Sequence, residues 1–405
     1  MPKHRILCRL LAGMGCVSLL AGVVLWGTAA ALPDTFYTPA GEASLRIASM
    51  PWVSAVRTSG TVARAGNASG DKSRNVTLAL LGVIPLKTVR TVERETRSVQ
   101  ACGTPFGVKM FSDGALVVAF SDQYTDLGTE NPAKEAGLRL GDLIVSAGGR
   151  AVRSNEELSA AITAAGGSAL SIVYRRDGRE YTTTLTPMTD STTGAYRAGL
   201  WVRDSSAGIG TMTFLDPANG TFAGLGHAIS DTDTGTDIAL LSGEIVPVTI
   251  TGCVSGAAGS PGELRGEFSA AAAGTVLAND TTGVYGCYTG PMEGESLPLA
   301  WPQQIEPGEA EILVTISGST PRRYTVRIER VDMTSSDPNR NLLLRVTDPE
   351  LLAATGGIVQ GMSGSPILQN GCLVGAVTHV LVNDPSRGYG IFASTMLEKA
   401  DAIAP

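Results

Sequence analysis

The sequence has few aromatic residues, histidines and charged residues, and each shortage excludes a class of protein. Aromatic side chains make up 5% of the 405 residues, and charged side chains make up 17%. The net charge is −7, and no basic stripe follows the first ten residues. Because nucleic-acid binding needs a basic surface, we expect no nucleic-acid partner. Only three histidines occur, with no C-x-x-C motif or Cys/His cluster, so we expect no metal and no other cofactor.

Glycine is abundant, with 49 residues, and short aliphatic or β-branched runs recur between the glycines. This composition favours short strands and tight turns over a helical bundle. From residue 191 to residue 405, such runs recur roughly every eight to twelve residues, the spacing of an all-β barrel or sandwich. The length of the chain allows two or three domains, and we expect a mainly β fold.

The N-terminus has the features of an export signal. Three basic residues among the first nine precede an uncharged run from Leu10 to Leu32. This run exceeds the roughly 20 residues that cross a bilayer, and the basic flank places the rest of the chain outside the membrane. Small residues at 28–31 would suit signal peptidase. Residues 1–32 are therefore expected to be a retained signal-anchor or, alternatively, a cleaved signal.

Two segments follow before the first predicted domain. Residues 33–75 are rich in small residues without periodicity, which indicates a linker. Residues 76–102 are expected to form a connector that contains one buried strand. Four cysteines lie in the exported part, and their pairing does not follow from the sequence; they are Cys102, Cys253, Cys287 and Cys372.

Residues 103–190 resemble a PDZ domain, most specifically in the stretch AKEAGLRLGDLIVSAGG. A helix is predicted to start after an N-cap at Ser154 or Asn155, and a hairpin is predicted to turn on Asp177 and Gly178. In PDZ domains, the loop before the second strand presents backbone N–H groups to a peptide carboxylate. That resemblance assigns Gly107 and Val108 to peptide binding. A β-rich spacer without a ligand is the alternative.

Ser363 is the candidate nucleophile. It lies in the sequence GMSGSPI, between a glycine-rich approach and an apolar strand. Small neighbours permit a tight turn that exposes the hydroxyl and aims backbone N–H groups at one point, as an oxyanion hole requires. The motif resembles the nucleophile loop of chymotrypsin-like peptidases, and Gly361 and Ser363 would supply the two N–H groups.

A serine nucleophile needs a base, and only His227 and His379 follow the N-terminal segment. His227 lies in a glycine-flanked turn and is the preferred base, whereas His379 is expected to shape specificity or to pack in the core. The orienting acid is less determined. Asp231 and Asp233 are close to His227 in sequence, while Asp348 gives the order His, Asp, Ser of chymotrypsin-like enzymes.

The chain resembles the SpoIVB peptidases, the stage IV sporulation serine peptidases. The resemblance rests on LLGVIPLKTV, the PDZ-like region, GIGTMTFLDP, GLGHAISDTDTG, SPGELRG and GIVQGMSGSPILQNGCLVGAVTHVLVNDPSRGYGIF. It implies a chymotrypsin-like peptidase domain over residues 191–405, with a triad at His227, Asp348 and Ser363.

The resemblance also implies export across the forespore membrane into the intermembrane space. The implied activity there is cleavage of the chain itself and of a membrane-bound regulatory complex, which triggers intramembrane processing of pro-sigma-K. Two other readings compete with this one. The first is a non-catalytic PDZ adaptor at the membrane surface, and the second is a Deg/Htr-type quality-control protease. The second reading is disfavoured because that class carries its PDZ domain after the protease domain.

Overall fold

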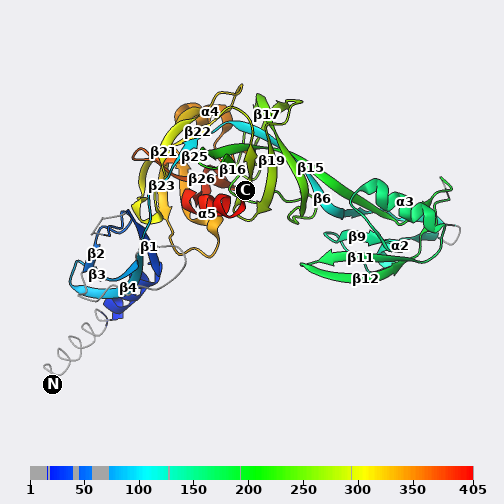
Figure 1. The fold of residues 1–405 in the computed structure, drawn as a ribbon, viewed down its shortest axis with the longest axis horizontal. Coiled ribbons are helices and arrows are strands. Elements are labelled where there is room, and N and C mark those ends of the chain that lie inside the picture. Colours follow the sequence, from blue (N-terminus) through cyan, green and yellow to red (C-terminus); the bar gives the residue numbers. More distant parts are fainter. Residues whose placement is uncertain are drawn as a thin grey trace, which may run out of the picture.

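The computed structural model describes residue 16 and residues 19–39, 45–56, 73–125, 128–191, 193–292 and 294–404. Most strands belong to three assemblies, namely a small N-terminal sheet, a large central sheet and a closed barrel (Figure 1). The prediction of a mainly β fold is confirmed. The predicted membrane segment lies partly outside the described residues, and residues 19–30 are helical. No helix within the described ranges has both the length and the apolar character needed to cross a bilayer.

The N-terminal sheet corrects the expected linker over residues 33–75. Its strands are ordered β1-β4-β3-β2. The bounds are β1 (Thr35–Thr38), β2 (Val53–Val56), β3 (Ser73–Leu80) and β4 (Ile84–Glu93). Phe36 and Val53, which lie in the expected linker, pack with Leu78 and Val89 in a separate buried cluster. The apolar residues of this segment are too widely spaced for a periodic signal, but they suffice to cover one face of a four-stranded sheet.

The central sheet is built on two long antiparallel strands, β6 (Pro105–Phe120) and β15 (Leu200–Asp216). Their pairing extends from Leu200 opposite Phe120 to Thr211 opposite Pro105. Figure 1 shows both strands running from the middle of the molecule into the lobe at its far end. The remaining strands of this sheet are β5 (Ser98–Ala101), β9 (Leu143–Ala147), β10 (Arg150–Ala151), β11 (Leu170–Arg176), β12 (Arg179–Leu185), β16 (Thr221–Gly224), β17 (Leu240–Val254), β18 (Glu263–Phe268), β19 (Gly274–Asp280), β20 (Gly283–Tyr288) and β21 (Glu295–Pro298).

The far ends of β6 and β15, with β9 to β12, form a lobe that we call the distal lobe. It also contains α2 (Pro132–Glu135), α3 (Asn155–Ala165), β7 (Gln123–Thr125), β8 (Gly128–Glu130), β13 (Met188–Thr189) and β14 (Tyr196–Arg197). Ser154 is the N-cap of α3, as predicted, and accepts a hydrogen bond from the Glu157 amide. Asp177 and Gly178 turn the β11–β12 hairpin with φ of 50° and 73°, as a type I′ turn requires.

The distal lobe is an insertion within the central sheet and not a domain ahead of it. β5 and the first half of β6 precede the lobe in sequence, yet they pair with β15 and β17, which follow it. This corrects the expected order of a complete domain over 103–190 followed by a second over 191–405. Periodicity could not reveal the insertion, because it does not show which distant strands the two halves of β6 pair with.

Gly107 and Val108 therefore lie elsewhere than expected. Both belong to the first half of β6, where Gly107 pairs with Ile209 and Val246. Val108 is buried in the core of the central sheet. The backbone groups of both residues face neighbouring strands on two sides, so they do not form a carboxylate-binding loop of the distal lobe. The expected role of these two residues in peptide binding is corrected by this placement.

The C-terminal quarter of the chain closes into a six-stranded barrel in the order β22-β23-β24-β27-β26-β25. Its elements are η1 (Pro302–Gln304), β22 (Gly308–Val314), β23 (Arg322–Val331), η2 (Pro338–Arg340), β24 (Leu342–Val346), α4 (Pro349–Thr355), β25 (Pro366–Gln369), β26 (Cys372–Leu381) and β27 (Asp384–Phe392). Alternate residues of β23, namely Tyr324, Val326 and Ile328, fill the barrel, as the two-residue period of a strand dictates.

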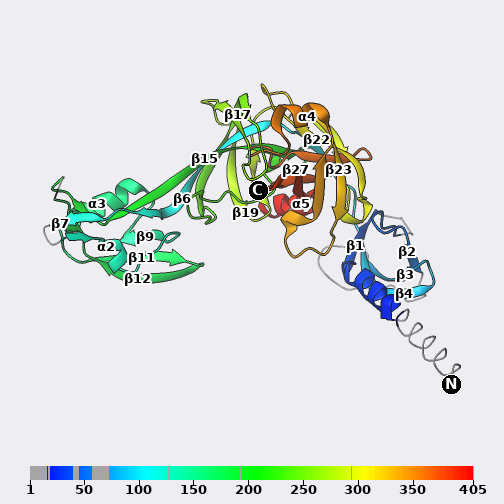
Figure 2. The same cartoon turned by 180° about the vertical axis from the view of Figure 1, so that it is seen from behind.

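The last helix, α5 (Ala393–Ile403), ties the barrel to the central sheet, and Figure 2 shows it beside β27. Met396 and Ala400 of this helix belong to one buried cluster with Phe214 and Tyr285 of the central sheet. The two β assemblies thus share a core. The junction between them is fixed by packing, which allows residues from both sides to form one site.

Candidate active site

A cleft of about 620 Å³ opens at the junction of the central sheet and the barrel. His227 lines it from the sheet side, and Ser363 lines it from the barrel side. Gly361 and His379 also line this cleft. The structure therefore brings the predicted nucleophile and the predicted base to one site, although they lie far apart in the sequence.

Ser363 lies in a tight turn between α4 and β25. Gly361 and Gly364 in this turn have φ of 95° and 94°, which residues with a side chain rarely adopt. A Cβ atom at Gly364 would lie 1.9 Å from the carbonyl oxygen of Thr211. Thr211 of β15 holds the turn by donating its N–H to the Ser363 carbonyl oxygen at 2.9 Å and its hydroxyl to the Gly361 carbonyl oxygen at 2.8 Å.

Two N–H groups of the turn remain available for a ligand. Within the described part of the chain, the backbone N–H groups of Gly361 and Ser363 donate no hydrogen bond, whereas those of Met362 and Gly364 donate to carbonyl oxygens. An oxyanion hole needs backbone N–H groups that have no acceptor within the protein and that lie at or near the nucleophile. They are the two groups that the sequence assigns to this role.

The Ser363 hydroxyl is half-buried and donates to the carbonyl oxygen of Thr378 at 2.7 Å. Thr378 is held in turn, because its own hydroxyl donates to the Asn339 carbonyl oxygen at 2.7 Å. The nucleophile therefore rests away from a base in this structure. Rotation about χ1 moves a serine hydroxyl between staggered positions, and such rotations are fast.

His227 follows β16 through a strained turn, in which Leu225 and Gly226 have φ of 66° and 70°. Its Nδ1 atom lies 2.7 Å from the carbonyl oxygen of Ala228. Because a carbonyl oxygen only accepts, Nδ1 carries the proton and Nε2 is left as the acceptor. Burial lowers the pKa of His227, although the hydrogen bond to Ala228 and the charge of Asp237 partly oppose this. The ring is therefore neutral at pH 7 and able to act as a base.

His379 stacks against His227, with the ring centroids 4.7 Å apart and the planes tilted by 33°. Its side chain is exposed and lines the cleft. Partial removal from water and then the adjacent His227 imidazole lower the pKa of His379 to about 4, while the charge of Asp337 opposes them. Two neutral rings can stack without charge repulsion, so His379 supports the position of His227 at neutral pH.

The structure does not bring Asp348 to His227. The Asp348 carboxylate caps α4 by accepting from the amides of Glu350 at 2.9 Å and Leu351 at 3.1 Å, and it also accepts from the Thr325 amide at 3.2 Å. Asp348 does not line the cleft. Burial opposes ionisation of this group, but hydrogen bonds from Leu351 and Thr325 outweigh it and lower the pKa. The role of Asp348 as the triad acid stays a prediction.

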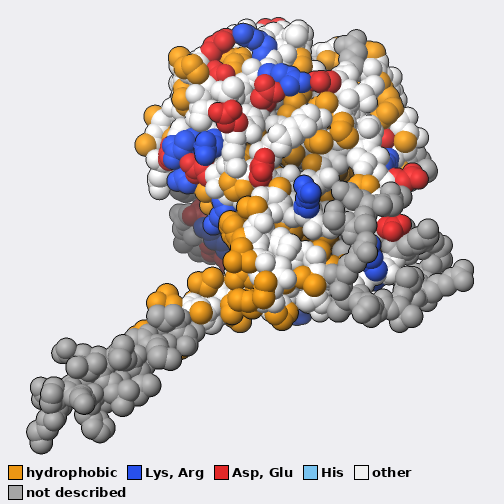
Figure 3. Space-filling view, turned by 90° about the vertical axis from the view of Figure 1, so that its left-hand side faces the viewer, with side chains coloured by type: hydrophobic (Ala, Val, Ile, Leu, Met, Phe, Trp, Pro, Cys, Tyr) orange, Lys and Arg blue, Asp and Glu red, His pale blue; other side chains and the backbone are white. Residues whose placement is uncertain are grey.

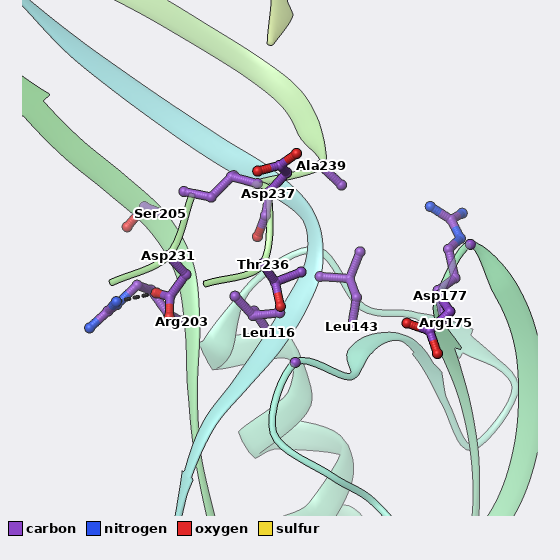
Figure 4. Close-up of a pocket in the computed structure, with 14 residues that line it drawn as sticks. Leu116, Leu143, Arg175, Asp177, Arg203, Ser205, Asp231, Thr236, Asp237 and Ala239 are labelled. Atoms are coloured by element: carbon purple, nitrogen blue, oxygen red, sulfur yellow. Dashed lines mark hydrogen bonds and ion pairs between the residues drawn. The ribbon is translucent and has the colours of Figure 1, made fainter. Parts of the chain in front are cut away.

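The other acids near His227 have different partners. Asp231 is buried and ion-pairs with Arg203, which also binds Asp233 at 2.8 Å. Figure 4 shows the guanidinium of Arg203 directed at Asp231. Asp237, on the same loop as Asp231, lines a cavity of about 190 Å³ beside the distal lobe. Asp237 lines both this cavity and the catalytic cleft. It is the acid whose charge acts on His227.

No described cysteine lines the cleft. Among the described cysteines no disulfide forms. The Cys102 thiol donates to the Gln100 carbonyl oxygen, and burial raises the pKa of this thiol to about 12. No group of three or more His, Cys, Asp or Glu residues in the described ranges could hold a metal ion.

Comparison with known families agrees with this geometry. The model of the family SpoIVB peptidase S55 matches residues 194–397, half of the chain, including His227 and Ser363. The chain belongs to the SpoIVB peptidase S55 family. It is therefore a serine peptidase. A PDZ domain model matches residues 123–176, which identifies the distal lobe of this S55 peptidase as a PDZ domain.

Several solved structures are similar to parts of this S55 peptidase. The PDZ domain of the SdrC-like protein from Listeria monocytogenes is 23% identical, with a TM-score of 0.19, and the match covers 22% of this chain and 87% of that one. The active form of the Rv3671c protease from M. tuberculosis is 13% identical, with a TM-score of 0.29, and the match covers 49% and 74%. The thermostable serine protease AL20 from an extremophilic microorganism is 13% identical, with a TM-score of 0.29, and the match covers 49% and 91%. No curated protein matches the chain.

Three features of the S55 site were not predicted from the sequence. Thr211 clamps the nucleophile turn, the Ala228 carbonyl fixes the His227 tautomer, and Asp237 supplies the nearby negative charge. A backbone carbonyl leaves no signal in a sequence. Asp237 lies ten residues after His227, in the same acidic loop as Asp231 and Asp233, and only the fold of that loop selects among the three.

Proposed function

We propose that this chain is an endopeptidase that works by acyl transfer, with Ser363 as nucleophile and His227 as base. The observation that carries the proposal is the cleft itself. It combines a serine hydroxyl, a neutral imidazole and the two backbone amides of Gly361 and Ser363, which donate no hydrogen bond within the described part of the chain. A serine peptidase needs these three elements for its first chemical step.

The reaction starts when the Ser363 hydroxyl turns from the Thr378 carbonyl towards Nε2 of His227. Oγ attacks the peptide carbonyl carbon while Nε2 takes the hydroxyl proton. The negative charge on the carbonyl oxygen is stabilised by the amides of Gly361 and Ser363. His227 then gives the proton to the leaving amine, and the C–N bond breaks to leave an acyl-serine. Water attacks this ester with His227 as base, which regenerates Ser363 and releases the acid product.

The orienting group at Nδ1 has two candidates. The Ala228 carbonyl oxygen accepts from Nδ1 in the structure, whereas the resemblance to SpoIVB peptidases assigns this role to Asp348. A carbonyl dipole fixes the tautomer as a carboxylate does, but it stabilises the imidazolium less. Asp237 offers the missing negative charge at longer range.

We further propose that the substrates are proteins at a membrane surface. By the resemblance to SpoIVB peptidases, these are the chain itself and a membrane-bound regulatory complex whose cleavage triggers processing of pro-sigma-K. The place of action is the space between forespore and mother cell, with residues 1–32 as signal or tether. A PDZ domain supports this proposal, because PDZ domains bind extended peptide segments.

Self-processing tests the proposal. Purified full-length chain, incubated alone and followed by mass spectrometry, is expected to yield defined N-terminal fragments. Ser363→Ala and His227→Ala are each expected to stop their formation while the melting temperature stays close to that of the parent. Ser365→Ala serves as the control, because Ser365 is the buried serine of the same turn and donates only to the Met362 carbonyl. Unchanged fragments in both active-site variants would support the non-catalytic adaptor instead.

A further inference from the structure

The N-terminal domain exposes a cluster of large apolar side chains, which we call the apolar tip. It consists of Trp52 and the β3–β4 turn residues Leu81, Val83 and Ile84. Leu81 is 74% exposed and Val83 is 80% exposed. The Leu81 amide donates to the Trp52 carbonyl oxygen at 2.8 Å, so the two parts of the tip are adjacent. No charged residue occurs from Asn75 to Leu86.

The residues of this turn do not suit its backbone conformation. Leu81 and Gly82 have φ of 51° and 73°, the pair of positive angles that a type I′ turn requires. Asn or Asp followed by Gly suits such a turn, whereas a branched apolar residue in the left-handed region is disfavoured. An exposed leucine there is unfavourable for both backbone and solvation reasons. A contact that buries the side chain would account for it.

The register of the N-terminal sheet fixes which way the tip points. β1 is parallel to β4, with Thr35 opposite Arg90. Ile84, where β4 begins, therefore extends six residues beyond the start of β1, towards the helical residues 19–30. The Lys87 ammonium, which donates to the Leu32 carbonyl oxygen at 2.6 Å, lies between them. The tip and the N-terminal helix thus occupy the same side of the domain.

The helix that reaches this side is itself apolar and uncovered. Leu19, Val23 and Trp26 are 72%, 64% and 76% exposed. Figure 3 shows hydrophobic side chains gathered where the helix joins the body of the molecule. The helix belongs to the uncharged run that begins at Leu10. A helix that is apolar all round is stable only when it is buried in protein or lipid.

We propose that the apolar tip inserts into the outer surface of the bilayer that holds residues 10–32. Three observations select lipid as the occupant: the tip has no charge, it lies beside the apolar N-terminal run, and it contains a tryptophan, which favours the membrane interface. The tip would form a second point of attachment and orient the domain on the membrane. This inference rests on the proposed membrane-side location but is independent of the peptidase chemistry.

A photocrosslinking experiment tests the tip directly. A benzophenone amino acid replaces Val83 in one version of the full-length chain and Leu140 in another. Leu140 is an exposed leucine, 53% accessible, in the distal lobe at the opposite end of the molecule (Figure 1). Both versions are mixed with vesicles of phosphatidylethanolamine and phosphatidylglycerol, floated on a density gradient and irradiated. Lipid adducts are expected at position 83 at several-fold the level at position 140.

Each other outcome overturns the proposal. Equal amounts of lipid adduct at positions 83 and 140 would show that the tip stays in water. Failure of the parent chain to float with the vesicles would show that the chain does not bind the membrane. Adducts between position 83 and a second copy of the chain would make the tip a protein interface. Cleavage of a soluble peptide is measured in the same samples. Normal cleavage without lipid adducts would therefore separate failure of this inference from failure of the peptidase proposal.

Discussion

The backbone N–H of Thr211 donates to the carbonyl oxygen of Ser363 at 2.9 Å, which joins the nucleophile turn to strand β15. The same strand begins at Leu200, opposite Phe120 in the PDZ domain. A single element thus connects the PDZ domain with the nucleophile. A second connection passes through the loop that contains Asp237, which lines both the catalytic cleft and the cavity at the PDZ domain.

Thr211→Val is expected to weaken the clamp on the nucleophile turn. It removes the hydroxyl that donates to the Gly361 carbonyl oxygen at 2.8 Å. Losing this bond should lower the free energy of unfolding by about 1 kcal/mol, and it should lower kcat because Gly361 is the proposed oxyanion donor. Thr211→Ser keeps the hydroxyl and is the matched control. Equal kcat in the two variants would show that the clamp has no part in catalysis.

Gly361→Ala is expected to distort the oxyanion hole. The φ of 95° is strained for alanine, and the new Cβ would lie 3.0 Å from the Cβ of Leu264. If the Gly361 amide moves out of line, kcat should fall about 10²-fold, as for loss of one oxyanion donor. Gly371→Ala is the control, because Gly371 also has positive φ, of 74°, but has open space around it. Parallel losses of activity in both variants would argue against the assigned hole.

Asp237→Asn is expected to shift the pH profile of kcat/KM. Burial lowers the pKa of His227, and the charge of Asp237 raises it in part. Removing that charge should lower the pKa of His227 further. Because the base works only when neutral, the acid limb of the profile should then move to lower pH. Asp233→Asn, in the same loop but paired with Arg203, should leave the limb in place. A shift to higher pH in Asp237→Asn would contradict this account.

Substitution of Asp348 separates a capping role from a catalytic role. Asparagine caps a helix about as well as aspartate, whereas alanine costs about 1 kcal/mol. From the contacts of Asp348 with the amides of α4, we expect Asp348→Asn to keep most of the activity and Asp348→Ala to lose stability. The readouts are kcat and the free energy of unfolding. A fall in kcat of about 10⁴-fold in a stable Asp348→Asn variant would restore the triad assignment.

The sequence predicted the features of the site that follow from a local motif, and missed the contacts of Thr211, Ala228 and Asp237, which depend on the fold. Ser363 and His227 could be found because the serine lies among glycines and the histidines are few. The α3 cap at Ser154 and the I′ turn at Asp177 were also predictable, because each follows from a local rule.

The pairing of strands that lie far apart in the chain was harder to predict from the sequence. The first half of strand β6 pairs within the central sheet and its second half pairs within the PDZ domain, and the local sequence does not show which partners a strand takes. For the same reason Gly107 and Val108 were assigned to the wrong part of the fold. The core of the N-terminal sheet draws on widely spaced residues such as Phe36 and Val89, which gives no local period.

Covalent trapping tests the central claim most directly, namely that Ser363 is activated by His227 in the cleft. The full-length chain is treated with a fluorophosphonate, digested and mapped by mass spectrometry. We expect one phosphonyl adduct, on Ser363, with a rate that falls steeply in His227→Ala and stays unchanged in Ser365→Ala. A chain that cleaves peptide but carries the adduct on another residue, with Ser363 unmodified, would contradict the claim.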